Sequence, residues 1–179
     1  MPEKPPIQEL RADQCHHADI SDEQYFLIGR IIVEWSKLEA TMEDTIWMFL
    51  DIDEDDGKAI TKRLGADGKL QLLRTLGARY ILVDELRAPF VKLLQYVDEL
   101  KEGRNFIAHG TWGTLMPDNV PVALSLKSKA DPGEVISETF PKERMDAIYD
   151  SILLAKRKLI DLPELLGKPR RVPREPPRP

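Results

Sequence analysis

The side chains of this chain that are best suited to chemistry lie in the run Arg104-Asn105-Phe106-Ile107-Ala108-His109-Gly110, at the expected end of a helix. An arginine is permanently charged and can hold a phosphate in two-point contact, whereas a histidine exchanges a proton near neutral pH. Together they suit RNA cleavage. The five-residue step turns Arg104 and His109 about 140° apart around a helix axis, so one helix aims them only partly at a common point. A second copy of the helix would complete such a site.

Neighbouring residues extend this candidate site. Asn105 lies four residues before His109 and shares its face, so its amide can orient the imidazole or contact a phosphate oxygen. Lys101 lies three residues before Arg104, close enough on a helix to share a phosphate. Gly110 fits a helix C-cap, which puts His109 in the last turn. The helix dipole alone would also favour basic residues at these positions.

Arg104 also falls on the apolar stripe of its predicted helix. The stripe follows the three-and-four spacing of an amphipathic helix through Phe90, Leu93, Val97, Leu100, Arg104 and Ile107. An arginine on a packing face is either paired or set in a crevice between helices. Its position on the packing face therefore favours a functional role for Arg104, because an arginine without such a role would be expected on the solvent-exposed face of the helix.

Two further side chains have a structural interpretation beside the functional one. Trp112 could stack on a nucleic-acid base, although a Trp in a short hairpin more often covers a core. Glu39 interrupts the apolar period of the first long helix. It either orients Arg104 or His109 of a packed helix or points to water at the edge of the seam, and we favour the second interpretation.

The Arg-Asn-x-x-x-His run at the end of a long helix resembles the signature of the HEPN superfamily, small helical bundles named for higher eukaryotes and prokaryotes nucleotide-binding. The segment from Gly29 to Glu43 is similar to the first long helix of many bacterial members. The likeness covers roughly residues 21 to 162.

The resemblance implies a metal-independent endoribonuclease without a cofactor, whose paired subunits set Arg104 and His109 along one cleft at a homodimer interface. Many relatives are toxins or defence proteins, so the expected partners are RNA and an antitoxin or other protein. Other relatives have lost activity. The alternative is therefore a catalytically inactive module that binds RNA, a nucleotide or a protein.

Composition limits the remaining possibilities. The 179-residue chain has single-domain size, and its net charge of −5 argues against a surface that coats nucleic acid broadly. No segment is apolar enough to span a bilayer or to act as a signal peptide, and the single cysteine agrees with a reducing compartment, so we expect a cytoplasmic protein without membrane contact. The cations that could still build a local basic cleft are Lys62, Arg63, Lys69, Arg74, Arg79, Lys101 and Arg104.

No metal site is predicted. Cys15-His16-His17 offers three adjacent ligands in a polar arm, which is typical of accidental adjacency. The run from Asp51 to Gly57 begins like a calcium loop but lacks the required glycine and the final glutamate, so an acidic connecting loop explains it. The chain also lacks a Gly-rich phosphate loop and a nucleophile elbow.

The apolar periods and turn residues predict an all-α fold in the main, an antiparallel bundle of four to five helices with a small β-hairpin insertion before the last helix. Ser21 starts the first helix with a capping box, and Asp67 is the expected cap of a later one. The remaining helices are expected over 58–64, over about 68–80, from Asp84 or Ala88 to His109, and from Pro141 onward. Strands are expected over 111–116, 120–126 and 134–140. The predicted domains are a disordered arm (1–20), a HEPN-like bundle (21–166) and a disordered Pro/Arg-rich tail (167–179).

Overall fold

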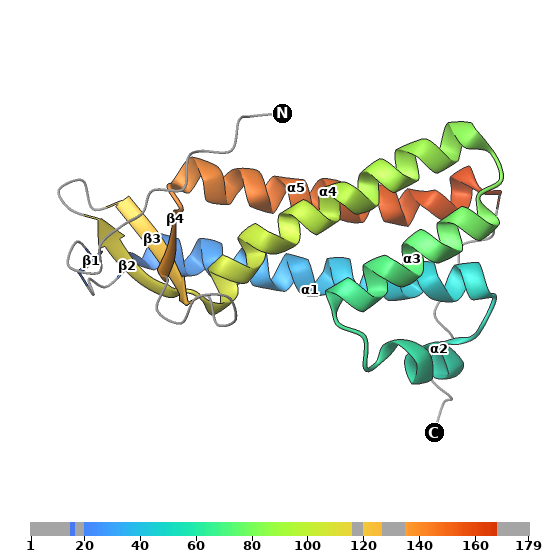
Figure 1. Ribbon diagram of the computed structural model, residues 1–179, viewed down its shortest axis with the longest axis horizontal. Coiled ribbons are helices and arrows are strands. Elements are labelled where there is room, and N and C mark those ends of the chain that lie inside the picture. Colours follow the sequence, from blue (N-terminus) through green and yellow to red (C-terminus); the bar gives the residue numbers. More distant parts are fainter. Residues whose placement is uncertain (1–14, 17–19, 116–119, 127–134, 168–179) are drawn as a thin grey trace, which may run out of the picture. The chain divides into compact units, whose positions relative to one another are not determined.

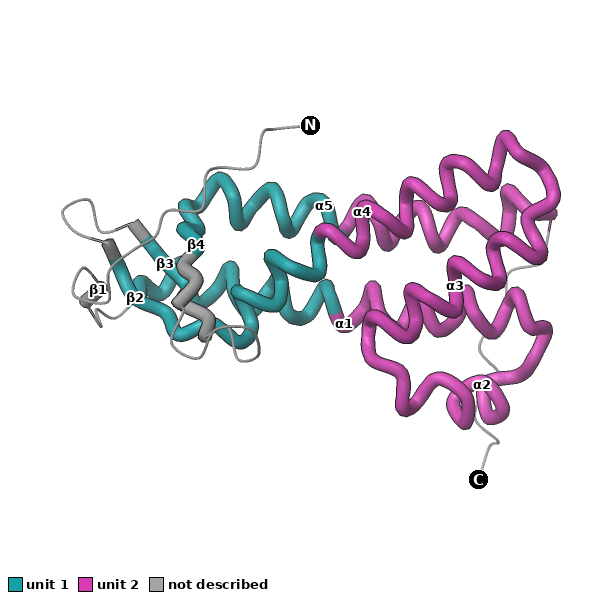
Figure 2. Tube along the Cα trace, in the orientation of Figure 1, with its two compact units in different colours: residues 1–35, 100–152 teal, residues 36–99, 153–179 magenta. Residues whose placement is uncertain are grey.

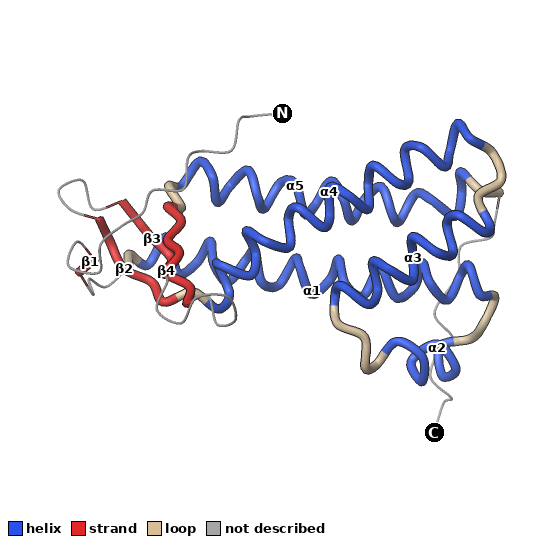
Figure 3. Tube along the Cα trace, in the orientation of Figure 1, coloured by secondary structure: helices blue, strands red, loops and turns tan. Residues whose placement is uncertain are grey.

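The computed structural model describes residues 15–16, 20–115, 120–126 and 135–167 (Figure 1). Within these residues the chain forms five helices and a small antiparallel sheet (Figure 3). The helices are α1 (Asp22–Leu50), α2 (Glu54–Thr61), α3 (Ala66–Tyr80), α4 (Asp84–His109) and α5 (Lys142–Leu165). The prediction of a mainly helical fold with a β insertion before the last helix is confirmed. None of the described helices is both long and apolar enough to cross a membrane.

The start of α1 follows the capping box that the sequence predicts. The backbone N–H of Ser21 donates to the Gln24 side chain over 2.7 Å, and the backbone N–H of Gln24 donates to the Ser21 hydroxyl over 3.3 Å. These two bonds satisfy donors that the first helical turn leaves without an internal partner. The helix stops at Leu50, because Asp51 takes a left-handed backbone conformation with φ of 54°.

The acidic run after α1 is a helix start rather than a loop. Asp53 is the N-cap of α2, and its side chain accepts a hydrogen bond of 3.0 Å from the backbone N–H of Asp56. Acidic residues fill the first turn, where the positive end of the helix dipole favours them. The prediction of a connecting loop from Asp51 to Gly57 is therefore wrong from Glu54 onward.

The start of α3 and the position of Pro89 differ from expectation, whereas α4 starts at Asp84, one of the two starts that the sequence predicts. Asp67 does not cap α3, since the helix begins at Ala66 with Gly65 as N-cap and no side-chain cap, which leaves Asp67 in the first turn. In α4, which starts at Asp84, Pro89 lies inside the helix rather than in its first turn.

The helix α4 ends at His109, directly before Gly110, as the sequence predicts, although Gly110 does not take the left-handed conformation that is common at such ends. The backbone N–H of Gly110 donates to the carbonyl of Phe106 over 2.8 Å, but within the described ranges only Asp51 and Gly167 have positive φ. The chain therefore runs from His109 directly into a strand without a left-handed C-cap.

The sheet has the strand order β1-β2-β3-β4, with every neighbouring pair antiparallel. Its strands are β1 (Cys15–His16), β2 (Thr111–Leu115), β3 (Val120–Leu126) and β4 (Val135–Thr139). The three predicted strands are present. β1 was not expected, because we predicted a disordered arm over residues 1–20. In the structure Cys15 pairs with Leu115 and Ile20 is buried, while residues 1–14 and 17–19 of the arm lie outside the described residues.

The chain divides into two compact units (Figure 2), and the predicted extent of a single helical domain over residues 21–166 stays a prediction. Unit 1 is residues 1–35 with 100–152, and unit 2 is residues 36–99 with 153–179. The buried core of unit 1 includes Leu27, Ile31, Trp35, Ile107, Phe140, Met145 and Ile152. The buried core of unit 2 includes Leu38, Met42, Ile46, Leu70, Leu73, Leu94, Val97, Ala155 and Leu159. The predicted tail lies outside the described residues from 168 onward.

Candidate functional site

Arg104 lies half-buried in unit 1 against an aromatic ring rather than a carboxylate. Its guanidinium carbon is 5.6 Å from the centre of the Trp35 ring, which is within the range of a cation–π contact. Its Nη1 donates a hydrogen bond of 3.2 Å to Oδ1 of Asn105. Its Nε is closed off from solvent and meets no hydrogen-bond acceptor among the residues that the structure describes. Buried donors without a partner are rare in proteins, and each calls for a structural or functional explanation.

Two other arginines of the described residues, Arg74 and Arg144, are each paired with a carboxylate, whereas Arg30 and Arg79 lie over aromatic rings as Arg104 does. Nη2 of Arg74 lies 2.9 Å from Oδ2 of Asp98, in unit 2. In unit 1, Arg144 pairs with Glu138 and also donates to the carbonyl of Thr139 over 2.6 Å. No ion pair of Arg104 occurs among the described residues. An aromatic face attracts a cation without cancelling its charge, so Arg104 keeps a net positive charge available to an anion.

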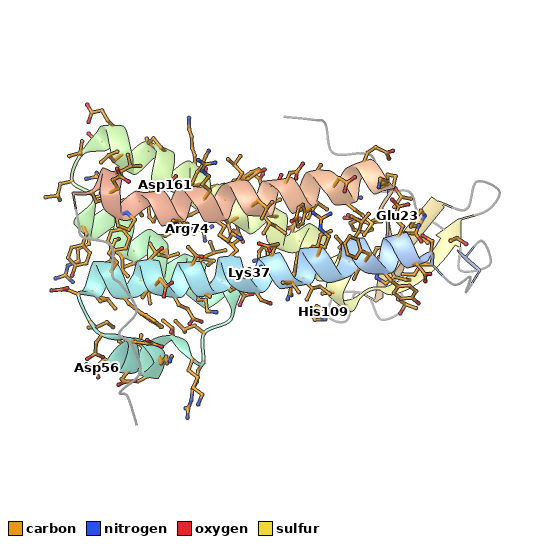
Figure 4. The ribbon with its side chains drawn as sticks, turned by 180° about the vertical axis from the view of Figure 1, so that it is seen from behind. Glu23, Lys37, Asp56, Arg74, His109 and Asp161 are labelled. Atoms are coloured by element: carbon orange, nitrogen blue, oxygen red, sulfur yellow. The ribbon has the colours of Figure 1, made fainter. Side chains whose placement is uncertain are left out.

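His109 is exposed at the last position of α4, next to the start of β2 (Figure 4). Within the part of the chain that the structure describes, its imidazole makes no hydrogen bond, ion pair or ring contact. Because His109 and Arg104 stay on one regular helix, they remain about 140° apart around its axis, as the sequence predicts. One chain therefore does not bring the two side chains together.

Asn105 and Lys101 accompany Arg104 on α4. Asn105 is exposed, and its carbonyl oxygen bonds to Arg104 instead of the imidazole that we expected it to orient. Lys101 lies half-buried one turn before Arg104. The structure thus joins Asn105 to the cation of the site, and the contact of either residue with a phosphate stays a prediction.

Trp112 is held by the protein itself. Its indole N–H donates a hydrogen bond of 3.1 Å to the backbone carbonyl of Ile107, and its ring centre lies 5.5 Å from that of Phe140. The ring is half-buried. These contacts are of the kind made by a hairpin Trp that covers a core, and stacking of Trp112 on a base stays a prediction.

Glu39 takes part in a charge cluster of unit 2. Its Oε2 lies 3.1 Å from Nζ of Lys69, and Oε1 of Glu43 lies 2.7 Å from the same nitrogen. We favoured a Glu39 that points to water, and this interpretation is wrong because the carboxylate is paired with a buried lysine. Burial lowers the pKa of Lys69, but the two carboxylates outweigh it and leave the pKa above its ordinary value of 10.5.

These ion pairs also reduce the number of cations that are available to form a basic cleft. Lys69 and Arg74 are both neutralised by carboxylates inside unit 2, whereas Arg104 lies in unit 1. Within the described ranges, no group of three or more His, Cys, Asp or Glu side chains is placed to hold a metal ion. His17 of the Cys-His-His run lies outside the described residues.

The sequence did not reveal the part that Trp35 takes in the site. Trp35 follows the apolar period of α1 as an ordinary core residue, and it is 1% exposed. Its contact with Arg104 joins α1 to α4, and no spacing within a single sequence says which residue of one helix meets which residue of another.

Comparison of the chain with models of protein families, with curated proteins and with solved structures finds no match.

Proposed function

We propose that this protein is a metal-independent endoribonuclease of the HEPN type. The observation that carries the proposal is the state of Arg104, a half-buried cation that rests on an aromatic ring and has no carboxylate partner among the described residues. A cation kept unneutralised at a helix end, five residues from an exposed histidine, is suited to a phosphodiester whose negative charge grows during cleavage.

The proposed chemistry uses the 2′-hydroxyl of the RNA as the nucleophile. Its oxygen attacks the adjacent phosphorus and the bond from phosphorus to the 5′-oxygen breaks, which leaves a 2′,3′-cyclic phosphate and a 5′-hydroxyl. His109 accepts the 2′-hydroxyl proton or protonates the leaving oxygen, while Arg104 stabilises the charge on the phosphate. DNA lacks the nucleophile and is expected to be inert.

The angle between the two side chains supports a site built by two copies. Arg104 and His109 point about 140° apart on α4, so one chain presents them only partly to the same phosphate. In the proposed homodimer, each phosphate is held between α4 helices of two subunits, as the resemblance to HEPN proteins implies. A toxin or defence role, restrained by an antitoxin or other protein, belongs to the same proposal.

The experiment is an RNA cleavage assay with purified protein in excess chelator. The substrate is a pool of single-stranded and structured RNA, and mass spectrometry identifies the product ends. The test variants are Arg104→Ala and His109→Ala. Arg74→Ala is the matched control, because it removes an arginine that is neutralised by Asp98 and lies in the other unit.

Cleavage that yields cyclic phosphates, is retained by Arg74→Ala and is lost by both test variants supports the proposal. Loss of general acid–base or charge stabilisation typically lowers such a rate by about a hundredfold or more. Absence of cleavage by the wild type, or equal activity in the variants, overturns it in favour of an inactive binding module. Growth inhibition on expression, relieved by Arg104→Ala, tests the toxin role separately.

A further inference from the structure

We propose that Trp35 is a positioning residue that holds the Arg104 guanidinium ready for a phosphate anion. This inference rests on the proposed function, because it assigns to the same site the residue that sets its geometry. The observation is the contact of the Arg104 guanidinium with the Trp35 ring, 5.6 Å from its centre. Trp35 itself is 1% exposed and does not meet the substrate.

The ring is a fixed support for the cation. Trp35 is part of the buried core of unit 1 with Leu27 and Ile31, so it cannot swing aside without opening that core. A guanidinium over an indole face is attracted by the ring quadrupole, and indole attracts cations more strongly than the other aromatic side chains do. A carboxylate in the same place would also fix Arg104, but it would cancel the charge that a phosphate needs.

Asn105 fixes the guanidinium from a second direction. Its Oδ1 accepts from Nη1 of Arg104, while the ring of Trp35 supports the group and Nε is enclosed without an acceptor in the described part of the chain. The uncommitted N–H groups at the Nη end therefore remain to bind two phosphate oxygens. A cation that is held in place before the anion arrives loses little side-chain freedom on binding.

The test measures the affinity for two phosphate probes that cannot be cleaved by the proposed chemistry, a 2′-O-methyl RNA oligonucleotide and inorganic pyrophosphate. Trp35→Phe keeps an aromatic face, whereas Trp35→Leu and Trp35→Met keep apolar volume without one. Ile31→Ala is the matched control, because it removes a fully buried apolar side chain one turn before Trp35 on the same helix and takes away neither the aromatic face nor the hydrogen bond that hold Arg104. Each variant is made in the wild type and in Arg104→Ala, and circular dichroism verifies folding at the assay temperature.

We expect Trp35→Leu and Trp35→Met to weaken binding of the probes about tenfold and Trp35→Phe about twofold. In the Arg104→Ala background the same substitutions have no further effect, because Trp35 acts only through Arg104. Ile31→Ala retains wild-type affinity. A merely structural role would give equal weakening in both backgrounds, or similar weakening by Ile31→Ala, and either result overturns the inference, as does wild-type affinity in Trp35→Leu and Trp35→Met.

The two proposals fail in different ways. Binding of the probes that depends on Arg104 and Trp35, without any RNA cleavage, contradicts the ribonuclease and retains the role of Trp35. RNA cleavage that needs Arg104 but is unchanged in Trp35→Leu and Trp35→Met retains the ribonuclease and contradicts the role of Trp35. A wild-type protein that neither binds the probes nor cleaves RNA contradicts both.

Discussion

The indole N–H of Trp112 donates a hydrogen bond of 3.1 Å to the backbone carbonyl of Ile107. This carbonyl lies in the last turn of α4, where the helix offers no internal donor. Strand β2, which carries Trp112, thus caps the helix that carries Arg104 and His109. Gly110 follows the helix without a left-handed conformation. A left-handed C-cap would satisfy carbonyls at this helix end, and here the Trp112 side chain satisfies one of them.

Trp112→Phe tests this capping role. The substitution retains an aromatic ring beside Phe140 but removes the donor, so we expect the free energy of unfolding to fall by about 0.5 to 1.5 kcal/mol, the net value of one hydrogen bond. Urea unfolding followed by circular dichroism measures the change. An unfolding free energy equal to that of the wild type would show that the bond contributes nothing to the fold.

Gly77→Ala tests the packing of α3 against α4 in unit 2. A Cβ atom at Gly77 would lie 2.4 Å from the Phe90 ring, which is buried and cannot retreat freely. Overpacking of this kind costs about 1 to 3 kcal/mol of stability. The control is Gly29→Ala, where nothing lies within 4 Å and the better helix propensity of alanine adds about 0.5 to 1 kcal/mol. Thermal melting should show opposite shifts, and two shifts of the same sign would contradict the packing.

Lys69→Met tests the buried charge cluster. The substitution leaves the Glu39 and Glu43 carboxylates without their shared cation, and we expect a loss of roughly 1.5 to 3 kcal/mol at pH 7, the range for hydrogen bonds to charged groups. The folded pKa of Lys69 is raised, so its contribution is fully present below pH 10.5 and declines as pH rises through the raised value. Urea unfolding of wild type and Lys69→Met at pH 7, 9 and 11 should show a difference that is constant at first and smaller at pH 11.

The control for this cluster is Lys58→Met, which removes the exposed lysine paired with Glu54 on α2. Exposed pairs of this kind contribute little, so its unfolding free energy should equal that of the wild type. A Lys69→Met protein as stable as the control at pH 7 would refute the structural role of the cluster.

Asp44→Asn tests whether the fold disfavours the charged form of the Asp44 carboxyl. Desolvation by the surrounding protein, followed by the negative charges of Glu43 and Glu54, raises the pKa of Asp44 above its ordinary value of 3.8. A carboxyl with a raised folded pKa destabilises the protein when it is charged, and this penalty develops as pH rises from the unfolded to the folded pKa. Asp44→Asn should therefore melt at a higher temperature than the wild type at pH 7, with the difference gone at pH 3. A lower melting temperature at pH 7 would contradict the assigned environment.

The features of the fold that we predicted correctly depend on residues that are close together in the sequence. Ser21 and Gln24 form the predicted capping box, and the apolar stripe that ends in Ile107 faces the core, because both depend on spacings within one helix. The helix starts that we predicted wrongly depended on which of several suitable residues acts as the N-cap. Asp53 and Asp67 are both acceptable N-caps by type, and only the first is used as one.

The residues of the candidate site were selected from the sequence and stay predictions, whereas the contacts that they make could not be predicted from it. Arg104 was located from its position on an apolar stripe, and His109 from its spacing. Lys69 belonged among the solvated cations by residue type, whereas its burial follows from the packing of α3 on α1. Trp35 is likewise an ordinary core residue until its distance to Arg104 is known. Such pairings between helices depend on the packed arrangement.

The most direct test of the central claim is the initial rate of RNA cleavage in excess chelator by wild type, Arg104→Ala and Arg74→Ala at equal concentrations. We expect Arg74→Ala to cleave at the wild-type rate and Arg104→Ala to be slower by about a hundredfold or more, the effect of removing one charge-stabilising group. Equal rates in Arg104→Ala and wild type, or no cleavage by either, would contradict the claim that Arg104 is held unneutralised in order to act on RNA.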